Sequence, residues 1–180
     1  MSSSTTKKVY LRRFDRSYIE GYVSPATFQR PDGVEILKRS AQVIVVPYHE
    51  VRALYFVRDF EGLPDGDEEK RVFGSRPKVD GLWVRLTFRD DEAYEGVIAN
   101  DLLALHDPGV LFSPPDANSN TQRIYVPHAA LKEFKVLGVI GTPAHRRRTR
   151  RKVEPGKEQG DLFAASSNER PAQPPTEPPF

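Results

Sequence analysis

The chain has 180 residues, of which 38% are hydrophobic and 29% charged, with 16 prolines and no cysteine. The lack of cysteine excludes disulfides, iron–sulfur clusters, thiol catalysis and the usual structural zinc sites, and it fits a reducing cytoplasm. No apolar run reaches the length of a membrane span, and the opening MSSSTTKK has no apolar segment of a secretory signal, so we expect a cytoplasmic protein without membrane contact.

The charges are unevenly distributed along the chain. Residues 1–140 carry 19 Lys and Arg against 20 Asp and Glu, whereas residues 141–180 carry 8 against 5. Residues 1–140 therefore contribute −1 and residues 141–180 contribute +3 to the net charge of +2. The excess of basic residues lies in residues 141–180. The positive net charge of the whole chain is therefore poor evidence that residues 1–140 bind nucleic acid.

Residues 7–58 are predicted to form a series of short strands, which follow a flexible N-terminus of residues 1–6. Alternating apolar residues predict strands at Val9–Leu11, Ile19–Val23 and Val34–Leu37. The segment Gln42–Pro47 is almost entirely apolar, which predicts a strand buried on both faces or at the centre of a sheet. We expect a helical or 3₁₀ turn over His49–Leu54 and a closing strand over Leu54–Val57.

Residues 81–141 repeat this pattern after a polar linker over residues 59–80. The clearest stretch is Gly81–Ile98, in which two strands flank the charged turn Arg89–Glu92. The first strands align Val9 with Val84, and the last strands align Leu54 with Phe134. The spacing between equivalent residues is larger at the end of the units, so the extra residues lie in the loop Ser113–Thr121. We therefore interpret the chain as a tandem duplication.

Each unit holds the same series of motifs: a V-x-L strand, a charged turn, an E-G-x-hydrophobic strand, a G-V strand and a final strand–turn–strand. This series resembles the Sm-like and SH3-like small β-barrels, and QRIYVPHAALKEF resembles the last two strands of bacterial Sm proteins of the Hfq type. The resemblance implies an all-β fold with two homologous five-strand small barrels, which either close separately or share a sheet. The chain lacks the Lys-His pair of that bacterial family and the Arg-Gly signature of other Sm proteins, so their RNA-contacting residues are not carried over.

Longer segments resemble an uncharacterised bacterial family built from two such units. The segments FVRDF, GLWVRLTFRD and SPPDANSNTQRIYVP carry this resemblance, which extends over about residues 7–141. It implies a tandem architecture and no particular activity.

Residues 142–180 form a basic and Pro-rich tail, which we expect to be disordered because it has few apolar residues to bury. We expect its basic run to contact DNA or RNA phosphates weakly and without sequence preference. The run consists of Arg146, Arg147, Arg148, Arg150, Arg151 and Lys152. Its Arg-x-x-x-Arg spacing is similar to the cyclic-di-GMP site of PilZ domains, but the companion motif of that site is absent.

Later in the tail, the sequence QGDLF resembles the pentapeptide through which bacterial proteins bind the replicative sliding clamp. Leu162 and Phe163 would anchor in a preformed apolar pocket, and Gln159 would fix the register by hydrogen bonds. Asp161 matches the acidic or Ser position of the motif, whereas Gly160 replaces the favoured Leu and weakens the expected binding.

The leading hypothesis is a non-enzymatic bacterial adaptor that binds the sliding clamp and weakly contacts nucleic acid. One alternative is an Sm-like RNA- or DNA-binding module with contacts on the loops near Asn100–Asp101, Tyr48–His49 or His128. Another is a structural or signalling module that binds a protein or, less favoured, a cyclic dinucleotide. We expect no catalytic residue, metal or cofactor, and the sequence leaves the oligomeric state open.

Two acidic features have simple structural interpretations. Glu20 and Glu95 recur at the same position of the two units and are interpreted as solvent-facing or turn-binding residues rather than an acid–base pair. The cluster Asp90–Glu92 is interpreted as a hairpin tip rather than a cation site. Several aromatic residues near the N-terminus, Tyr10, Phe14, Tyr18, Tyr22 and Phe28, are expected to pack as core and cross-strand pairs rather than to stack on bases.

Overall fold

The structure is a computed structural model that describes residues 6–62, 71–101, 106–116 and 119–141. These residues form the all-β molecule that the sequence predicts, apart from one 3₁₀ turn, η2 (His128–Ala130). The strands are β1 (Lys7–Arg13), β2 (Tyr18–Val23), β3 (Gln29–Arg30), β4 (Gly33–Lys38), β5 (Val43–Pro47), β6 (Val51–Val57), β7 (Gly81–Phe88), β8 (Ala93–Ile98), β9 (Gly109–Ser113), β10 (Thr121–Pro127) and β11 (Leu131–Ile140).

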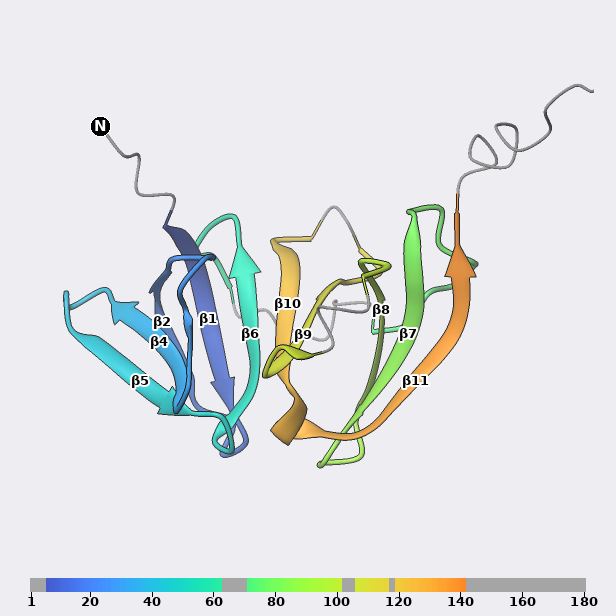
Figure 1. Cartoon of the computed structure of the whole chain (residues 1–180). Helices are drawn as coiled ribbons and strands as arrows, with labels where there is room; N and C mark the ends of the chain where they lie inside the picture. The colour runs from blue at the N-terminus through green and yellow to red at the C-terminus, as the bar shows by residue number, and fades with distance from the viewer. Residues whose placement is uncertain (1–5, 63–70, 102–105, 117–118, 142–180) are drawn as a thin grey trace, which may run out of the picture.

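The eleven strands belong to one open antiparallel sheet. Its order is β11-β7-β8-β9-β10-β6-β1-β2-β4-β3, and β5 pairs with β4. In Figure 1 the sheet curves into two groups, β1–β6 and β7–β11, which stand side by side and are called the first and second half below. The halves join where β6 pairs with β10, with Leu54 opposite Tyr125 and Tyr55 opposite Ile124. The two sequence units therefore share a sheet.

The strands of the two halves pair in the same register. Counted without β3, the order of strands in each half is fifth, first, second, third, fourth: β6-β1-β2-β4-β5 and β11-β7-β8-β9-β10. Corresponding pairs of opposed residues are Val9–Gly21 and Val84–Gly96, Leu11–Leu54 and Leu86–Phe134, and Gly33–Pro47 and Gly109–Pro127. These correspondences agree with the alignment of the two units in the sequence.

The first hairpin turn is also built alike in the two halves. The backbone N–H of Ser17 donates to Asp15 Oδ1 at 2.9 Å, and the backbone N–H of Glu92 donates to Asp90 Oδ1 at 3.3 Å. The residue between each donor and acceptor has a left-handed backbone, with φ of 69° at Arg16 and 61° at Asp91. An Asp before a left-handed residue is favourable because its side chain replaces a backbone acceptor in the turn.

Two hydrophobic clusters form the core. One lies within the first half and includes Val9, Leu11, Ile36 and Leu54, together with Tyr125 from β10. The other covers the opposite face of β1 and β6 and fills the second half, with members such as Tyr10, Tyr55, Leu86, Phe112 and Ile124. Because both of its faces are covered, β6 is buried at all seven positions.

Two predictions for the end of the first unit were wrong. His49–Leu54 holds no helical turn, because β6 begins at Val51 and its side chains pack alternately into the two clusters. The apolar segment Gln42–Pro47 forms β5, but this strand pairs with β4 alone among the described residues and is not at a sheet centre. Val43 and Val45 are consequently 60% and 46% exposed.

Candidate functional site

The tail residues singled out in the sequence lie outside the described residues. These are the basic run Arg146, Arg147, Arg148, Arg150, Arg151 and Lys152 and the pentapeptide residues Gln159, Asp161, Leu162 and Phe163. A functional site in the body, residues 7–141, has to be sought from the geometry of the sheet itself.

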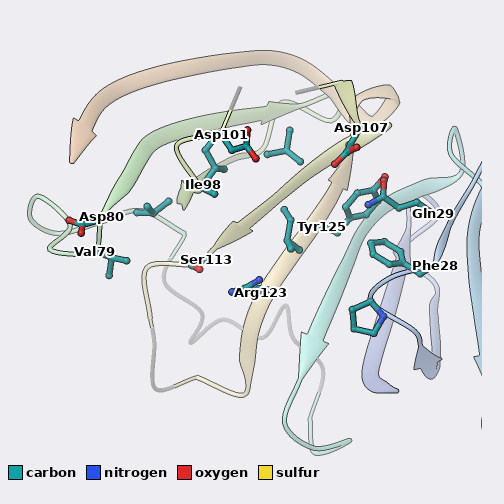
Figure 2. Close-up of a pocket in the computed structure, with 16 residues that line it drawn as sticks. Phe28, Gln29, Val79, Asp80, Ile98, Asp101, Asp107, Ser113, Arg123 and Tyr125 are labelled. Atoms are coloured by element: carbon teal, nitrogen blue, oxygen red, sulfur yellow. The ribbon is translucent and has the colours of Figure 1, made fainter. Parts of the chain in front are cut away.

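A hollow of the body runs along β9 and β10, at the junction of the halves. Three cavities of about 420, 500 and 460 Å³ adjoin there and share lining residues. The first and third share Phe28, Leu111 and Arg123, and the first and second share Val97 and Ser113. These adjoining cavities are together called the β9–β10 groove below, and Figure 2 shows the residues that line the first of them.

The floor of the groove is apolar and well packed. Phe28, from the first half, makes edge-to-face contacts with Phe56 at 5.8 Å and with Tyr125 at 5.0 Å between ring centroids. Figure 2 shows Phe28 and Gln29 next to Tyr125 on β10. Burial raises the pKa of the Tyr125 hydroxyl above its ordinary value. Sequence reasoning missed this contact because Phe28 and Tyr125 belong to different units.

The charges along the groove are unevenly distributed. The described residues lining the second and third cavities include basic side chains and no acidic one: Lys7, Arg58, Arg76, Lys78 and Arg123. The first cavity adds three acidic side chains, Asp80, Asp101 and Asp107. Figure 2 shows Asp101 and Asp107 toward the upper end of this cavity and Arg123 lower down. The groove therefore offers a track of basic side chains, with Asp101 and Asp107 toward one end and Asp80 beside Val79, which also lines the second cavity.

A buried cation fixes the two halves to each other. Arg52 on β6 is 1% exposed, and it donates to Asp90 Oδ2 at 2.7 Å and to Glu92 Oε2 at 2.5 Å in the turn between β7 and β8. Its guanidinium lies 4.2 Å from the centre of the Phe88 ring. Burial is the largest single effect and opposes the charge of Arg52, but the hydrogen bond to Asp90 and the charges of Asp90 and Glu92 together outweigh it and raise the pKa of Arg52.

Asp90 and Glu92 thus lie at a hairpin tip, and they also hold a structural ion pair. Burial is the largest single effect and would raise the pKa of Asp90, but the hydrogen bond and charge of Arg52 and the backbone hydrogen bonds together outweigh it, so the pKa is lowered and the carboxylate stays charged. The sequence signal for this pair was a lone Arg inside the apolar run VRALYFV, because a charge in such a strand needs a partner.

Glu95 is buried, so the expectation of a solvent-facing or turn-binding residue was wrong for it. Its side chain is 4% exposed and accepts hydrogen bonds from Arg85 Nη2 at 2.6 Å, from Trp83 Nε1 at 3.2 Å and from the backbone N–H of Phe73 at 3.2 Å. Burial acts to raise the pKa of Glu95, but these donors, led by Arg85, hold it below its ordinary value. Glu20 at the equivalent position is 40% exposed and pairs with Arg39 at 3.1 Å.

The three loops considered for nucleic-acid contact have different surroundings. Asp101 lines the groove, whereas the Tyr48 hydroxyl donates to the backbone oxygen of Arg30 at 2.7 Å. His128 borders a separate hollow with Phe134.

The early aromatic residues pack as expected. Tyr10 is 2% and Phe28 4% exposed, and Tyr10 and Tyr22 both contact Phe60 edge to face. Their rings are therefore occupied by contacts within the sheet rather than offered as a stacking surface.

Two further properties concern the part of the chain that the structure describes. It contains no group of three or more His, Asp or Glu placed to hold a metal ion. It also contains no helix with the length and apolar character needed to cross a membrane.

A family model matches residues 5–138, which include both halves, the groove and the buried ion pairs. Its description is a family of unknown function, DUF6982. The chain belongs to this family. Comparisons with curated proteins and with solved structures give no match.

The extent of the family match separates the two candidate regions. The basic track of the groove, from Lys7 to Arg123, lies within the matched residues. The basic run and the pentapeptide of the tail lie beyond residue 138. A role of the groove would therefore belong to the family domain, whereas a role of the tail would be an addition to it.

Proposed function

We propose that the protein is a non-enzymatic, cytoplasmic bacterial adaptor that binds the replicative sliding clamp through its tail. The single observation that carries the proposal is the pentapeptide Gln159-Gly160-Asp161-Leu162-Phe163, with two adjacent apolar anchors in a polar segment. The body would be the scaffold of this adaptor. Its matching strand registers support two homologous small units of the Sm-like or SH3-like kind.

The order of elements suits a tail that reaches away from the body. The last strand ends at Ile140, and the pentapeptide begins at Gln159. If fully extended, the chain between these two residues would span up to roughly 60 Å. The basic run lies between them, so clamp and DNA contacts on one tail would raise each other's effective concentration.

The direct test is fluorescence anisotropy of a labelled peptide covering Lys157–Ser167, titrated with a bacterial sliding clamp. We expect a dissociation constant of roughly 1–100 μM, because Gly160 removes one apolar contact of the motif. The matched control peptide carries Leu162→Ala and Phe163→Ala, which remove both anchors and should abolish binding. The full-length protein should compete with the labelled peptide, and its Leu162→Ala/Phe163→Ala variant should not.

Equal binding of both peptides would show that the contact is not made through the anchors and would contradict the proposal. Failure of both peptides and of the full-length protein to bind would do the same.

The basic track of the groove favours a second candidate, an Sm-like module that binds RNA or DNA with its body. Five basic side chains line adjoining cavities over the apolar floor, and no acidic residue lines those two cavities among the described residues. Phosphates along this track would neutralise the charges and release counterions. Because residues 1–140 carry a net charge of −1, we expect such binding only on this basic face.

This candidate predicts salt-dependent binding of a labelled single-stranded oligonucleotide by the full-length protein. With five phosphate contacts, affinity should fall roughly 100-fold between 50 and 200 mM salt. Lys78→Glu or Arg123→Glu alone should weaken binding several-fold, whereas Arg39→Glu in the first half serves as a charge-matched control outside the groove. If only replacement of the six basic tail residues by Gln weakens binding, the groove is not the site.

A further inference from the structure

The two ends of the sheet carry strands whose outer edges have no strand partner among the described residues. One end is β5, which pairs only with β4, and the other is β11, which pairs only with β7. Figure 1 shows them at opposite sides of the molecule, β5 at the far left and β11 at the far right. Open edges present unpaired N–H and C=O groups and are ready to pair with another strand.

The junction inside the chain shows how these two edges would fit each other. At that junction β6, the fifth strand of its half, pairs with β10, the fourth strand of the other half. In the matching registers, β11 corresponds to β6, with Phe134 in the place of Leu54. Likewise β5 corresponds to β10, with Pro47 in the place of Pro127. The two open edges are therefore second copies of the two strands that form the internal junction.

This correspondence identifies the residues that would oppose each other. Leu54 opposite Tyr125 becomes Phe134 opposite Val45. In the same way, Phe56 opposite Arg123 becomes Val136 opposite Val43.

The corresponding residues differ in their exposure to solvent. At the internal junction Leu54 and Tyr125 are fully buried and Phe56 is 8% exposed. Three of their counterparts, Phe134, Val136 and Val45, are 36%, 48% and 46% exposed. The fourth, Val43, is 60% exposed and takes the position of an Arg.

The contrast extends to whole strands. β6 is buried at all seven positions, whereas β11 is buried only at Ile140. Large apolar side chains on an open edge are what native sheets normally avoid, because such an edge associates with other strands. Here three of the apolar residues, Phe134, Val136 and Val45, stand at positions that the internal junction buries.

We propose that β11 of one copy of this protein pairs antiparallel with β5 of a second copy, in the register of the internal β6–β10 junction. The partner is thus a second copy of the same chain, and each contact places Phe134 on Val45 and Val136 on Val43. The contact is head to tail, because it joins two different surfaces. Head-to-tail contacts repeat from copy to copy and produce either a closed ring or a filament.

The test blocks one edge at a time in the full-length protein. Val43→Lys/Val45→Lys disables β5 and leaves β11 intact, whereas Phe134→Lys/Val136→Lys disables β11 and leaves β5 intact. All four side chains are exposed, so the variants should keep the wild-type circular dichroism and thermal midpoint. Val72→Lys is the matched control, because Val72 is 52% exposed and lies on neither edge strand.

The readout is molar mass by sedimentation or light scattering, over concentrations up to about 200 μM. Wild type and Val72→Lys should assemble beyond a dimer as concentration rises. Each edge variant alone should stay monomeric. A mixture of the two should form a one-to-one heterodimer and stop there, because each variant supplies the edge that the other lacks.

Several outcomes would overturn the proposal. A wild-type protein that is monomeric throughout this range has no such contact. A dimer formed by one edge variant alone would show that an edge pairs with its own copy, and assembly that survives in both variants would place the interface elsewhere. Loss of sliding-clamp binding would leave the proposal unaffected, since neither edge strand contains the pentapeptide.

Discussion

Glu20 and Glu95 occupy the same position in the two halves, but only one of them is buried. The carboxylate of Glu95 is covered because the segment before β7 folds back over it and supplies the backbone N–H of Phe73. Glu20 has no such cover and pairs with the exposed Arg39. The sequence around each residue is Glu-Gly in a strand, so the local pattern contains nothing that distinguishes the two environments.

We expect Glu95→Gln to lower the free energy of unfolding at pH 7 by about 1–3 kcal/mol, because Arg85 and two other donors lose a charged acceptor. The pKa of Glu95 is below its ordinary value in the folded state. Its stabilisation is therefore complete above the unfolded-state pKa of about 4.3 and disappears as the pH falls through the folded-state pKa. Urea unfolding followed by circular dichroism between pH 7 and 3 measures both effects.

The variant should show a shallower loss of stability with acid than the wild type. Glu20→Gln is the matched control, and it should change stability less because both Glu20 and Arg39 are well exposed. Parallel acid profiles for wild type and Glu95→Gln would show that the carboxylate does not contribute through its charge.

At the scale of the element, the Glu-Gly motif has a packing cause. Gly21 and Gly96 lie in the second strand of each half, where the third strand approaches closely. A Cβ at Gly96 would overlap the ring of Phe112, and a Cβ at Gly21 would overlap the backbone oxygen of Leu37. The recurrence of Gly in both units therefore reflects the curvature of the sheet at this point.

We expect Gly96→Ala to lower the free energy of unfolding by about 1–3 kcal/mol, because the Phe112 ring in the buried cluster must move. Gly138→Ala in β11 is the matched control, since no atom lies within 4 Å of the added Cβ. Its effect should stay within about 0.5 kcal/mol. Chemical denaturation of both variants compares them directly, and equal effects would contradict the packing explanation.

Some elements could be located from sequence and others could not, for physical reasons. The alternation in β2 and β7 indicates one buried face, and such alternation is a local property that the sequence displays. The apolar composition of β5 correctly indicated a strand but not its place at an edge, because burial depends on the partner strand. The start of β6 was missed because Arg52 interrupts an apolar run, and its partners lie in the other half.

At the scale of the whole molecule, the repeat was readable from sequence, but the junction was not. The order of like motifs predicts two similar units, since equivalent positions keep equivalent residue types, and the matching strand registers agree with that order. Which strands join the halves depends on contacts between the units, such as Tyr55 with Ile124 and Phe28 with Tyr125. The groove follows from that junction and was absent from the sequence prediction for the same reason.

The β6–β10 junction also has a consequence for the order in which the protein is made. The ribosome completes β6 at Val57, but its partner strand β10 does not begin until Thr121. At typical synthesis rates the wait is roughly 3–13 s. During this time the apolar strand β6 of the first half has an unpaired edge. In the complete protein, β10 pairs with this edge. The nascent chain therefore has an interval of exposure to aggregation and to chaperones that the folded protein does not have.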